Sequence, residues 1–344
     1  MKDRITVSDS QLARIENLKR GFLGDEKSPK VIVNIPPCSQ PATGDLISSA
    51  GFMLKSLLEN ARNRLEVADD YIPQIRVEFG TGQVANAFGC EMYIPNNSPV
   101  CSKGPLRCSL AEMAGMETPS LSAGWFKKAY EFTEYFLDNK PDWVGMQLLD
   151  FQSPFNNAHL IRGNDIMVDF YDDPETLDWF LEKLTSYQVD LVKHYRNLLG
   201  IEDGYIYDWG IVWKGNARMS NCSLHMISIE FYHEFIKKHI ARFISEVNSA
   251  RIHYCGTHDG GIVASFCGMP GMTGLDLDGK YHDPWELSYV MPEDVPLLIS
   301  PTKKQIDRIL SGDIPKKRNL ILFAYASCLE EAKVLYRELK SALS

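Results

Sequence analysis

Short apolar runs alternate with longer helical patterns along most of the chain. The apolar runs begin near residues 31, 72, 143, 204, 251, 272, 295 and 320, and glycine, proline or polar residues bound them as they bound buried strands. Segments with apolar residues at helical spacing separate most of these runs, most clearly residues 174–199 and 329–343. Strands that alternate with helices in this way favour a parallel sheet.

Eight such units predict an α/β fold, a (β/α)8 TIM-type barrel with irregular βα loops, formed by a single domain over residues 1–344. An N-terminal helix precedes the first unit, because Ser8 and Gln11 form a capping-box pattern ahead of apolar residues at helical spacing. Over residues 256–295 the helices are short or missing, and a doubly wound open sheet is the competing fold. Residues 90–122 are rich in proline and have no clear period, so we expect an extended insertion or lid there.

Composition and charge exclude several classes of function. The chain has 44% hydrophobic and 24% charged residues, and its formal net charge of −9 argues against a nucleic acid or a membrane surface as partner. The N-terminus lacks the apolar segment of a signal peptide, and the longest apolar runs are too short to span a bilayer, so we expect a cytoplasmic protein. The eight cysteines include no C-x-x-C pair and no secreted-domain spacing, which leaves reduced thiols available to a metal.

A histidine and a cysteine lie two residues apart at the end of one predicted strand, in the stretch R-I-H-Y-C-G. Side chains alternate faces along a strand, so His253 and Cys255 point the same way. Imidazole nitrogen and thiolate sulfur are ligands that zinc prefers, and a catalytic zinc site takes three protein ligands and keeps a fourth position open. We predict Cys328, at the end of the last strand, as the third ligand, with Cys267 as the alternative.

Barrel enzymes hold their active sites at the carboxyl ends of the strands. In the predicted barrel those ends also carry three aspartates. Asp208 and Asp276 are candidate catalytic residues, while Asp278 and His258 are candidate substrate contacts, and the aspartates could also hydrogen-bond His253. Each aspartate could equally well cap a helix or form a turn in a βα loop. His258 could likewise belong to a polar turn.

Several motifs resemble one known family. The H-Y-C-G strand end is followed by a distant cysteine before an E-E-A-K-x-L-Y-x-x-L helix, and residues 152–163 and 227–232 match further family segments loosely. These stretches resemble the uroporphyrinogen decarboxylase superfamily, in its branch of zinc- and cobalamin-dependent methyltransferases of the methylcobamide:coenzyme M type. His253, Cys255 and Cys328 fall on the H-x-C…C zinc positions of that branch.

The resemblance implies a zinc-dependent methyltransferase. It would move a methyl group from a methylated corrinoid, free or carried by a partner corrinoid protein, to a small-molecule acceptor with a thiol. Zinc deprotonates a coordinated thiol, and the resulting thiolate can attack the methyl group. Dimers are common in the resembling family, so a homodimer is also implied.

Two alternatives remain open. The first is a metal-free decarboxylase of a porphyrinogen-like carboxylate. Those enzymes resemble one another in an arginine-rich segment, R-Q-A-G-R, that holds substrate carboxylates. Here the equivalent segment after the first strand reads P-P-C-S-Q-P and has no arginine. Such an enzyme would need Arg76, Arg107 and Arg162 around its mouth. The second is a non-catalytic barrel with a structural zinc, whose closed four-ligand site would add His258 or Cys267.

Overall fold

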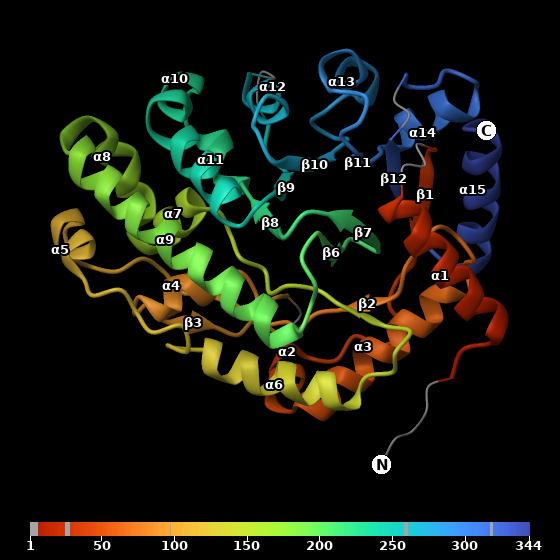
Figure 1. Cartoon of the computed structure of the whole chain (residues 1–344), viewed down its shortest axis with the longest axis horizontal. Helices are drawn as coiled ribbons and strands as arrows, with labels where there is room; N and C mark the ends of the chain where they lie inside the picture. The colour runs from red at the N-terminus through yellow and green to blue at the C-terminus, as the bar shows by residue number, and fades with distance from the viewer. Residues whose placement is uncertain (1–5, 25–27, 97, 258–260, 317–318) are drawn as a thin grey trace.

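The computed structural model describes residues 6–24, 28–96, 98–257, 261–316 and 319–344. At its centre is a six-stranded parallel sheet in the order β1-β12-β11-β10-β9-β8. Its strands are β1 (Lys30–Asn34), β8 (Ala217–Ser220), β9 (Ala250–Tyr254), β10 (Met272–Asp278), β11 (Leu297–Ser300) and β12 (Leu320–Tyr325). Figure 1 shows these strands curving across the molecule with helices on their outer side.

Two further parallel strands of the predicted ring are short. β2 (Gln74–Ile75) pairs only with β5 (Gly145–Met146). A single parallel bridge joins Gln152, after β5, to Ser220 at the end of β8. The predicted TIM-type α/β arrangement is therefore confirmed, in a form whose sheet is not closed by continuous ladders.

Carboxylates replace the missing ladder between β1 and β2. Asp70 Oδ2 accepts a hydrogen bond from Val31 N at 2.8 Å, and Asp69 Oδ2 accepts one from Val33 N at 2.7 Å. Arg64 Nη1 lies 3.2 Å from Asp69 Oδ2 and balances its charge. Burial raises the pKa of Asp69, and Arg64 and the Val33 amide oppose this shift. Side chains thus connect two strands that do not pair directly.

A β-hairpin lies against the inner face of the sheet. It is formed by β6 (Tyr205–Asp208) and the antiparallel β7 (Ile211–Lys214). The buried Trp213 ring lies 4.5 Å from the Arg251 guanidinium, and Gly274 makes room for it, since a Cβ there would lie 2.5 Å from the ring. The turn holds Trp209 beside Phe323 of β12, with ring centroids 5.1 Å apart. The hairpin therefore brings its turn toward the carboxyl ends of the strands.

This hairpin corrects one prediction about the ring. The segment beginning near residue 204 forms a strand as predicted, but its ladder partner is β7. Trp209 and Gly210 have positive φ angles of 51° and 76°, and their turn reverses the chain directly after Asp208. β8, which we did not predict, takes the place beside β9.

Helices cover the outside of the strands, and the N-terminal one has the predicted capping box between Ser8 and Gln11. The helices are α1 (Asp9–Leu23), α2 (Thr43–Ser48), α3 (Ala50–Leu65), α4 (Gln83–Ala87), α5 (Leu110–Gly115), α6 (Phe126–Asn139), α7 (Pro154–Arg162), α8 (Ile166–Asp172), α9 (Pro174–Leu199), α10 (Ile229–Phe231), α11 (Lys237–Glu246), α12 (Gly261–Cys267), α13 (Pro284–Val290), α14 (Lys303–Leu310) and α15 (Leu329–Ala342). Smaller elements are β3 (Met92–Tyr93), β4 (Cys101–Ser102), the 3-10 turns η1 (Gly163–Asp165) and η2 (Cys222–Met226), and the π-helical turn η3 (Tyr232–Ile236).

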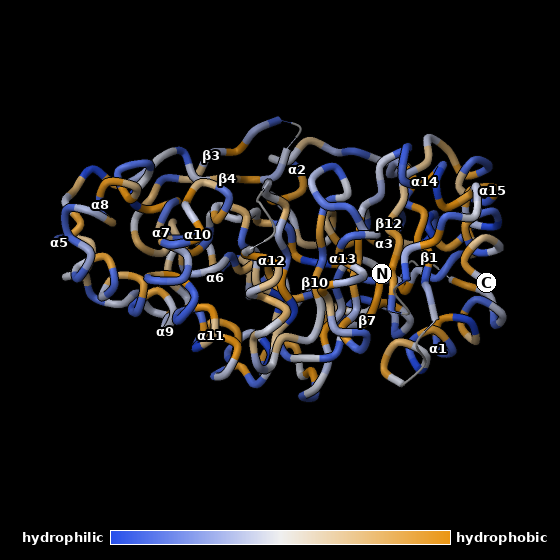
Figure 2. Tube along the Cα trace, turned by 90° about the horizontal axis from the view of Figure 1, so that it is seen from above, coloured by the Kyte–Doolittle hydropathy of each residue, from blue (hydrophilic) through white to orange (hydrophobic). Residues whose placement is uncertain are grey.

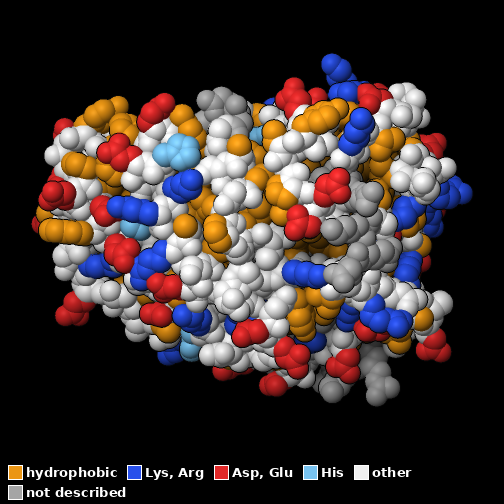
Figure 3. All heavy atoms as spheres, turned by 45° about the horizontal axis from the view of Figure 1, so that its top comes forward, with side chains coloured by type: hydrophobic (Ala, Val, Ile, Leu, Met, Phe, Trp, Pro, Cys, Tyr) orange, Lys and Arg blue, Asp and Glu red, His pale blue; other side chains and the backbone are white. Residues whose placement is uncertain are grey.

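Hydrophobic positions gather along the central strands, while helices at the edge alternate between hydrophilic and hydrophobic turns (Figure 2). On the face shown in Figure 3, lysine and arginine side chains are interspersed with acidic ones rather than gathered in one basic area. Among the helices in the described ranges, none is both long enough and apolar enough to cross a membrane.

Candidate metal centre

Two neighbouring strands present the same order of polar residues to the interior. The chain reads R-M-S-N-C over residues 218–222 and R-I-H-Y-C over residues 251–255. The parallel register of β8 and β9 sets the two arginines side by side and the serine beside the histidine. Because side chains alternate along a strand, the two cysteines that follow face the same side. Adjacent strands thus bring Cys222 and Cys255 together.

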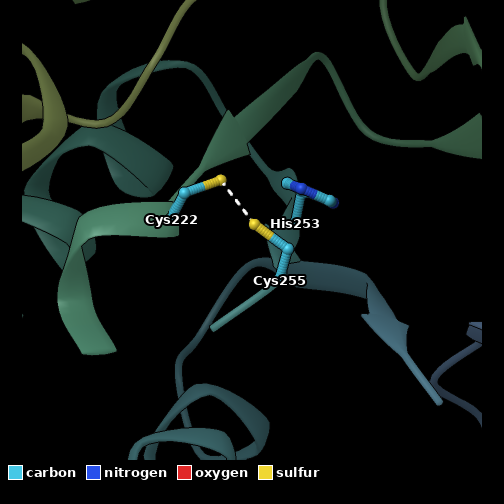
Figure 4. Close-up of side chains that lie close together, drawn as sticks. All are labelled: Cys222, His253 and Cys255. Carbon is cyan, nitrogen blue, oxygen red and sulfur yellow. Dashed lines mark hydrogen bonds between the residues drawn. The ribbon is translucent and has the colours of Figure 1, made fainter. Parts of the chain in front are cut away.

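Cys222, His253 and Cys255 form one compact group. A sulfur from each cysteine and a ring nitrogen of the histidine all lie within 4.8 Å of one another, and the two sulfurs are 2.9 Å apart. Figure 4 shows the two thiols pointing toward each other with His253 beside them. Two thiols and an imidazole are a donor set that zinc prefers, and three ligands leave its fourth position open. The residues present therefore fit a catalytic type of zinc site.

The predicted third ligand, Cys328, is not part of this group. Cys328 is exposed and lies at the N-cap of α15. The alternative, Cys267, ends α12 and is also outside the group. The physical reason is strand order: β8 is the neighbour of β9, whereas β10 and β11 separate β9 from β12. The sequence does contain a signal for Cys222 that we missed. Arginine, a polar residue and cysteine recur at the same spacing, first in residues 218–222 and again in residues 251–255.

Asp276 of β10 orients the histidine. The register of β9 and β10 sets Asp276 opposite His253, and Nδ1 of His253 donates a hydrogen bond to Asp276 Oδ1. Burial opposes both charged forms, yet Asp276 raises the pKa of His253, while His253 and Arg251 hold the pKa of Asp276 below its usual range. A carboxylate on Nδ1 fixes the ring and leaves Nε2 as the nitrogen that can bind a metal.

The two thiols differ in acidity. The contact with Cys222 lowers the pKa of Cys255 to about 5, against burial and with a further contribution from His253. The same contact and burial raise the pKa of Cys222. All eight cysteines of the chain are free of disulfides, as the sequence predicts. Cys255 is therefore the thiol that ionises first, and the thiolate is the form that binds metals.

Two arginines lie on the strands that carry the metal centre, Arg218 on β8 and Arg251 on β9. Arg251 is fully buried and forms ion pairs with Asp208 and Asp276. Arg218 lies 3.1 Å from Asp208 and 2.6 Å from Asp150, measured from guanidinium nitrogen to carboxylate oxygen. Both predicted catalytic aspartates belong to this network, where they balance arginine charges. A catalytic role for them stays a prediction.

The predicted substrate contacts lie farther along the chain. Asp278 lines a cavity beside Cys255, and its Oδ1 accepts a hydrogen bond from Lys280 N at 2.8 Å, as in a turn. His258 lies outside the described residues. Substrate contact by Asp278 or His258 therefore stays a prediction.

Two cavities meet at the metal centre. The first, which we call the charged cavity, has a volume of about 490 Å³ and is lined by polar residues that include Arg76, Glu78, Asp150, Arg218, Ser220 and Cys222. The second has a volume of about 410 Å³ and adjoins Cys255. Trp209 and His253 line both cavities, and their rings stack with centroids 6.3 Å apart. A molecule held at the two thiols can therefore extend to either side.

Comparison with known proteins defines the fold rather than a family. No protein-family model matches the chain, and no curated protein matches it. A solved structure of a methyltransferase from Methanosarcina mazei superposes with a TM-score of 0.65 and 16% sequence identity, over 94% of this chain and 98% of that one. The chain shares the fold of this methyltransferase. A Listeria monocytogenes structure described as a vitamin-B12 independent methionine synthase covers 61% of this chain and 67% of its own, with a TM-score of 0.37 and 15% identity.

Proposed function

We propose that this protein is a zinc-dependent methyltransferase that moves a methyl group from a methylated corrinoid to the sulfur of a small thiol. The observation that supports this most is the group of Cys222, His253 and Cys255 at the carboxyl ends of two adjacent strands. Active sites of this fold class lie at those ends. The corrinoid is either free or presented by a partner protein.

Zinc at this site would hold the sulfur of the acceptor at its open position and keep it deprotonated. The residues of the chain prepare that chemistry. Asp276 holds the His253 ring through Nδ1, and Arg251 balances the Asp276 charge from below. The two thiols face each other from adjacent strands, and as thiolate ligands they would keep an acceptor sulfur electron-rich. That sulfur would supply the electron pair of the new S–C bond, the corrinoid donor would keep the pair of the broken bond to the methyl carbon, and the thiol proton would pass to solvent.

Of the three arginines that the decarboxylase alternative would use, two are already paired with carboxylates. Arg76 lines the charged cavity but is paired with Glu78, Nε to Oε1 at 3.0 Å. Arg162 pairs with Asp169 at 2.7 Å, and Arg107 is exposed. A substrate with several carboxylates needs permanently charged donors that are free to bind them. Paired arginines do not meet that requirement.

The structural-zinc alternative requires a fourth ligand. Within the described ranges, the group at Cys222 contains three potential ligand residues and no fourth histidine, cysteine or carboxylate joins it. Cys267 lies outside the group, and His258, the other fourth ligand that this alternative names, lies outside the described residues. Three described ligands with cavities on both sides favour a catalytic metal over a closed structural one.

One experiment tests the proposal at two levels. Zinc content is measured by plasma mass spectrometry on the wild type and on Cys222→Ala, Cys255→Ala and Cys328→Ala. Each zinc-loaded protein is then mixed with methylcobalamin and a thiol, and loss of the methylcobalamin spectrum and formation of the thioether are followed. We expect about one zinc per chain and methyl transfer in the wild type and in Cys328→Ala, because Cys328 lies outside the group that we propose as the zinc site.

The two other variants should lose most of the zinc and slow methyl transfer by at least about 100-fold, since ligand loss removes the metal that activates the thiol. A wild type that binds no zinc even after incubation with it would overturn the proposal. So would a zinc-loaded wild type that demethylates methylcobalamin no faster than free zinc does.

A further inference from the structure

The charged cavity adjoins the metal centre and must hold whatever is attached to the acceptor sulfur. Cys222 and His253 form part of its wall, and its volume of about 490 Å³ is that of a small-molecule site. If the acceptor sulfur is bound at the two thiols, the rest of the acceptor molecule lies against the other walls of the charged cavity. The charges on those walls therefore select the acceptor, and this inference rests on the proposed function.

Each arginine of the cavity wall is already held by two carboxylates. Arg76 contacts both oxygens of Glu78, at 3.0 and 3.3 Å, and its Nη1 lies 3.7 Å from Asp150. Arg218 lies between Asp150 and Asp208. The wall thus has two arginines and three carboxylates. Behind it, Arg251 pairs with Asp208 and with Asp276, so the whole network still has one carboxylate more than it has arginines. An anionic group that entered would meet surplus negative charge, and it could reach a guanidinium only by displacing a carboxylate.

Ser220 is an independent sign of a polar ligand. Its side chain is 1% exposed and lines the charged cavity, and Oγ has no hydrogen-bond partner among the described residues. It precedes Cys222 by two residues on the same strand face. A buried hydroxyl without a partner is unfavourable, because it has lost its hydrogen bonds to water. A ligand that donates a hydrogen bond here would remove that cost.

We propose that the acceptor is a small thiol with an ammonium group, bound in the charged cavity by Glu78, Asp150 and the Ser220 hydroxyl. An ammonium group adds one positive charge to a wall with one carboxylate in excess and supplies three hydrogen-bond donors. Glu78 is the most accessible of these carboxylates, with 38% of its side chain exposed against 16% for Asp150 and 7% for Asp208. It can turn from Arg76 toward the ligand with the least rearrangement. An uncharged acceptor would displace the water that hydrates these charged groups, and it would not replace the hydrogen bonds that the water made.

Three thiols that differ only in the end group test the proposal. These are 2-aminoethanethiol, 2-mercaptoethanol and 2-mercaptoethanesulfonate, each assayed with methylcobalamin and zinc-loaded protein. We expect kcat/KM for the aminothiol to exceed that for the neutral thiol by about tenfold or more, and kcat/KM for the sulfonate to be the lowest. The reason is that charges close together in a partly buried site interact more strongly than they do in water. A sulfonate that is the best acceptor would overturn the proposal.

A matched pair of variants identifies the carboxylate. Glu78→Gln should raise KM for 2-aminoethanethiol about tenfold and change KM for 2-mercaptoethanol much less, because only the aminothiol loses a contact between opposite charges. Glu246→Gln is the control, because Glu246 has the same exposure, 37%, and pairs with Arg242 on the outside of the barrel. Equal changes for both thiols in Glu78→Gln would contradict an ammonium contact.

A binding measurement separates this inference from the proposed function. The thioether 2-(methylthio)ethylamine is titrated calorimetrically into the purified protein and into Glu78→Gln, with no donor present. Binding that Glu78→Gln weakens, together with no methylation of any thiol, would support the ammonium site and overturn the methyltransferase. Methyl transfer without preference among the thiols, together with binding that Glu78→Gln leaves unchanged, would overturn the ammonium site alone.

Discussion

Asp276 serves two neighbours at once. Its Oδ1 accepts the hydrogen bond from His253, and its Oδ2 pairs with the fully buried Arg251. A buried arginine needs compensating carboxylates, because an unpaired charge in the interior costs several kcal/mol. The same side chain therefore stabilises the interior and fixes the ring of a metal ligand.

Asp276→Asn should weaken zinc binding by about 10–100-fold, since a carboxylate on Nδ1 orients the ring and makes it a stronger ligand. Asp278→Asn, two residues further along β10, should change zinc affinity little, because Asp278 is not hydrogen-bonded to His253. Competition with a chromogenic chelator gives both affinities, and thermal unfolding shows whether each variant is folded. Equal zinc affinity in folded Asp276→Asn and the wild type would contradict the orienting role.

At the scale of elements, the β6–β7 hairpin decides the shape of the interior. Trp213 of β7 fills space against the sheet, where Gly274 leaves room and the Arg251 guanidinium lies over the ring. The turn of the hairpin then presents Asp208 to the arginines and Trp209 to the metal centre. One hairpin thus supplies part of the core and part of the cavity walls.

Gly274→Ala should lower the free energy of unfolding by about 1–3 kcal/mol, because its Cβ would overlap the buried Trp213 ring. Gly44→Ala in α2 is the control, since a Cβ there meets nothing within 4 Å and alanine favours helix. Urea unfolding followed by circular dichroism gives both values. A Gly274→Ala protein as stable as the control would show that the hairpin packs less tightly than the structure indicates.

At the scale of the whole molecule, Asp69 and Asp70 connect regions that are far apart in the sequence. Asp69 joins β2 to β1 through Val33 N, and Asp70 binds Val31 N and also Lys340 of α15, with Nζ at 2.7 Å. The first strand, the second strand and the last helix therefore share one pair of carboxylates. This contact stands where a continuous barrel would have a ladder.

Asp69→Ala should destabilise the protein by about 3–5 kcal/mol, because it leaves the buried Arg64 without its partner. It also leaves the Val33 N–H without an acceptor, so amide exchange in β1 should accelerate. Asp138→Ala, at an exposed position of α6, should change stability by no more than about 0.5 kcal/mol. Similar stability losses in the two variants would contradict a specific role of Asp69 in holding β1 and β2 together.

Much of the local structure was predictable because its causes are local. The capping box at Ser8, the periodicity of α9 and the strand alternation that sets His253 and Cys255 on one face all depend on residues close together in the sequence. The short β2 and β5 ladders have weaker local signals, and the predicted runs there extend well beyond the paired residues. The sequence also predicted the alternation of helices and strands over most of the chain, and hence the α/β class.

Only the tertiary structure decided which third residue joins His253 and Cys255. Cys328 and Cys222 both follow strands. The repeated spacing that ends at Cys222 and at Cys255 makes Cys222 a candidate, but it does not say which strand lies beside β9. That choice depends on the reversal at Trp209 and Gly210, which directs the chain into a hairpin and leaves β8 to pair with β9. Strand neighbours are set by hydrogen bonds between segments distant in sequence, so the partner of a metal ligand is a property of the folded sheet.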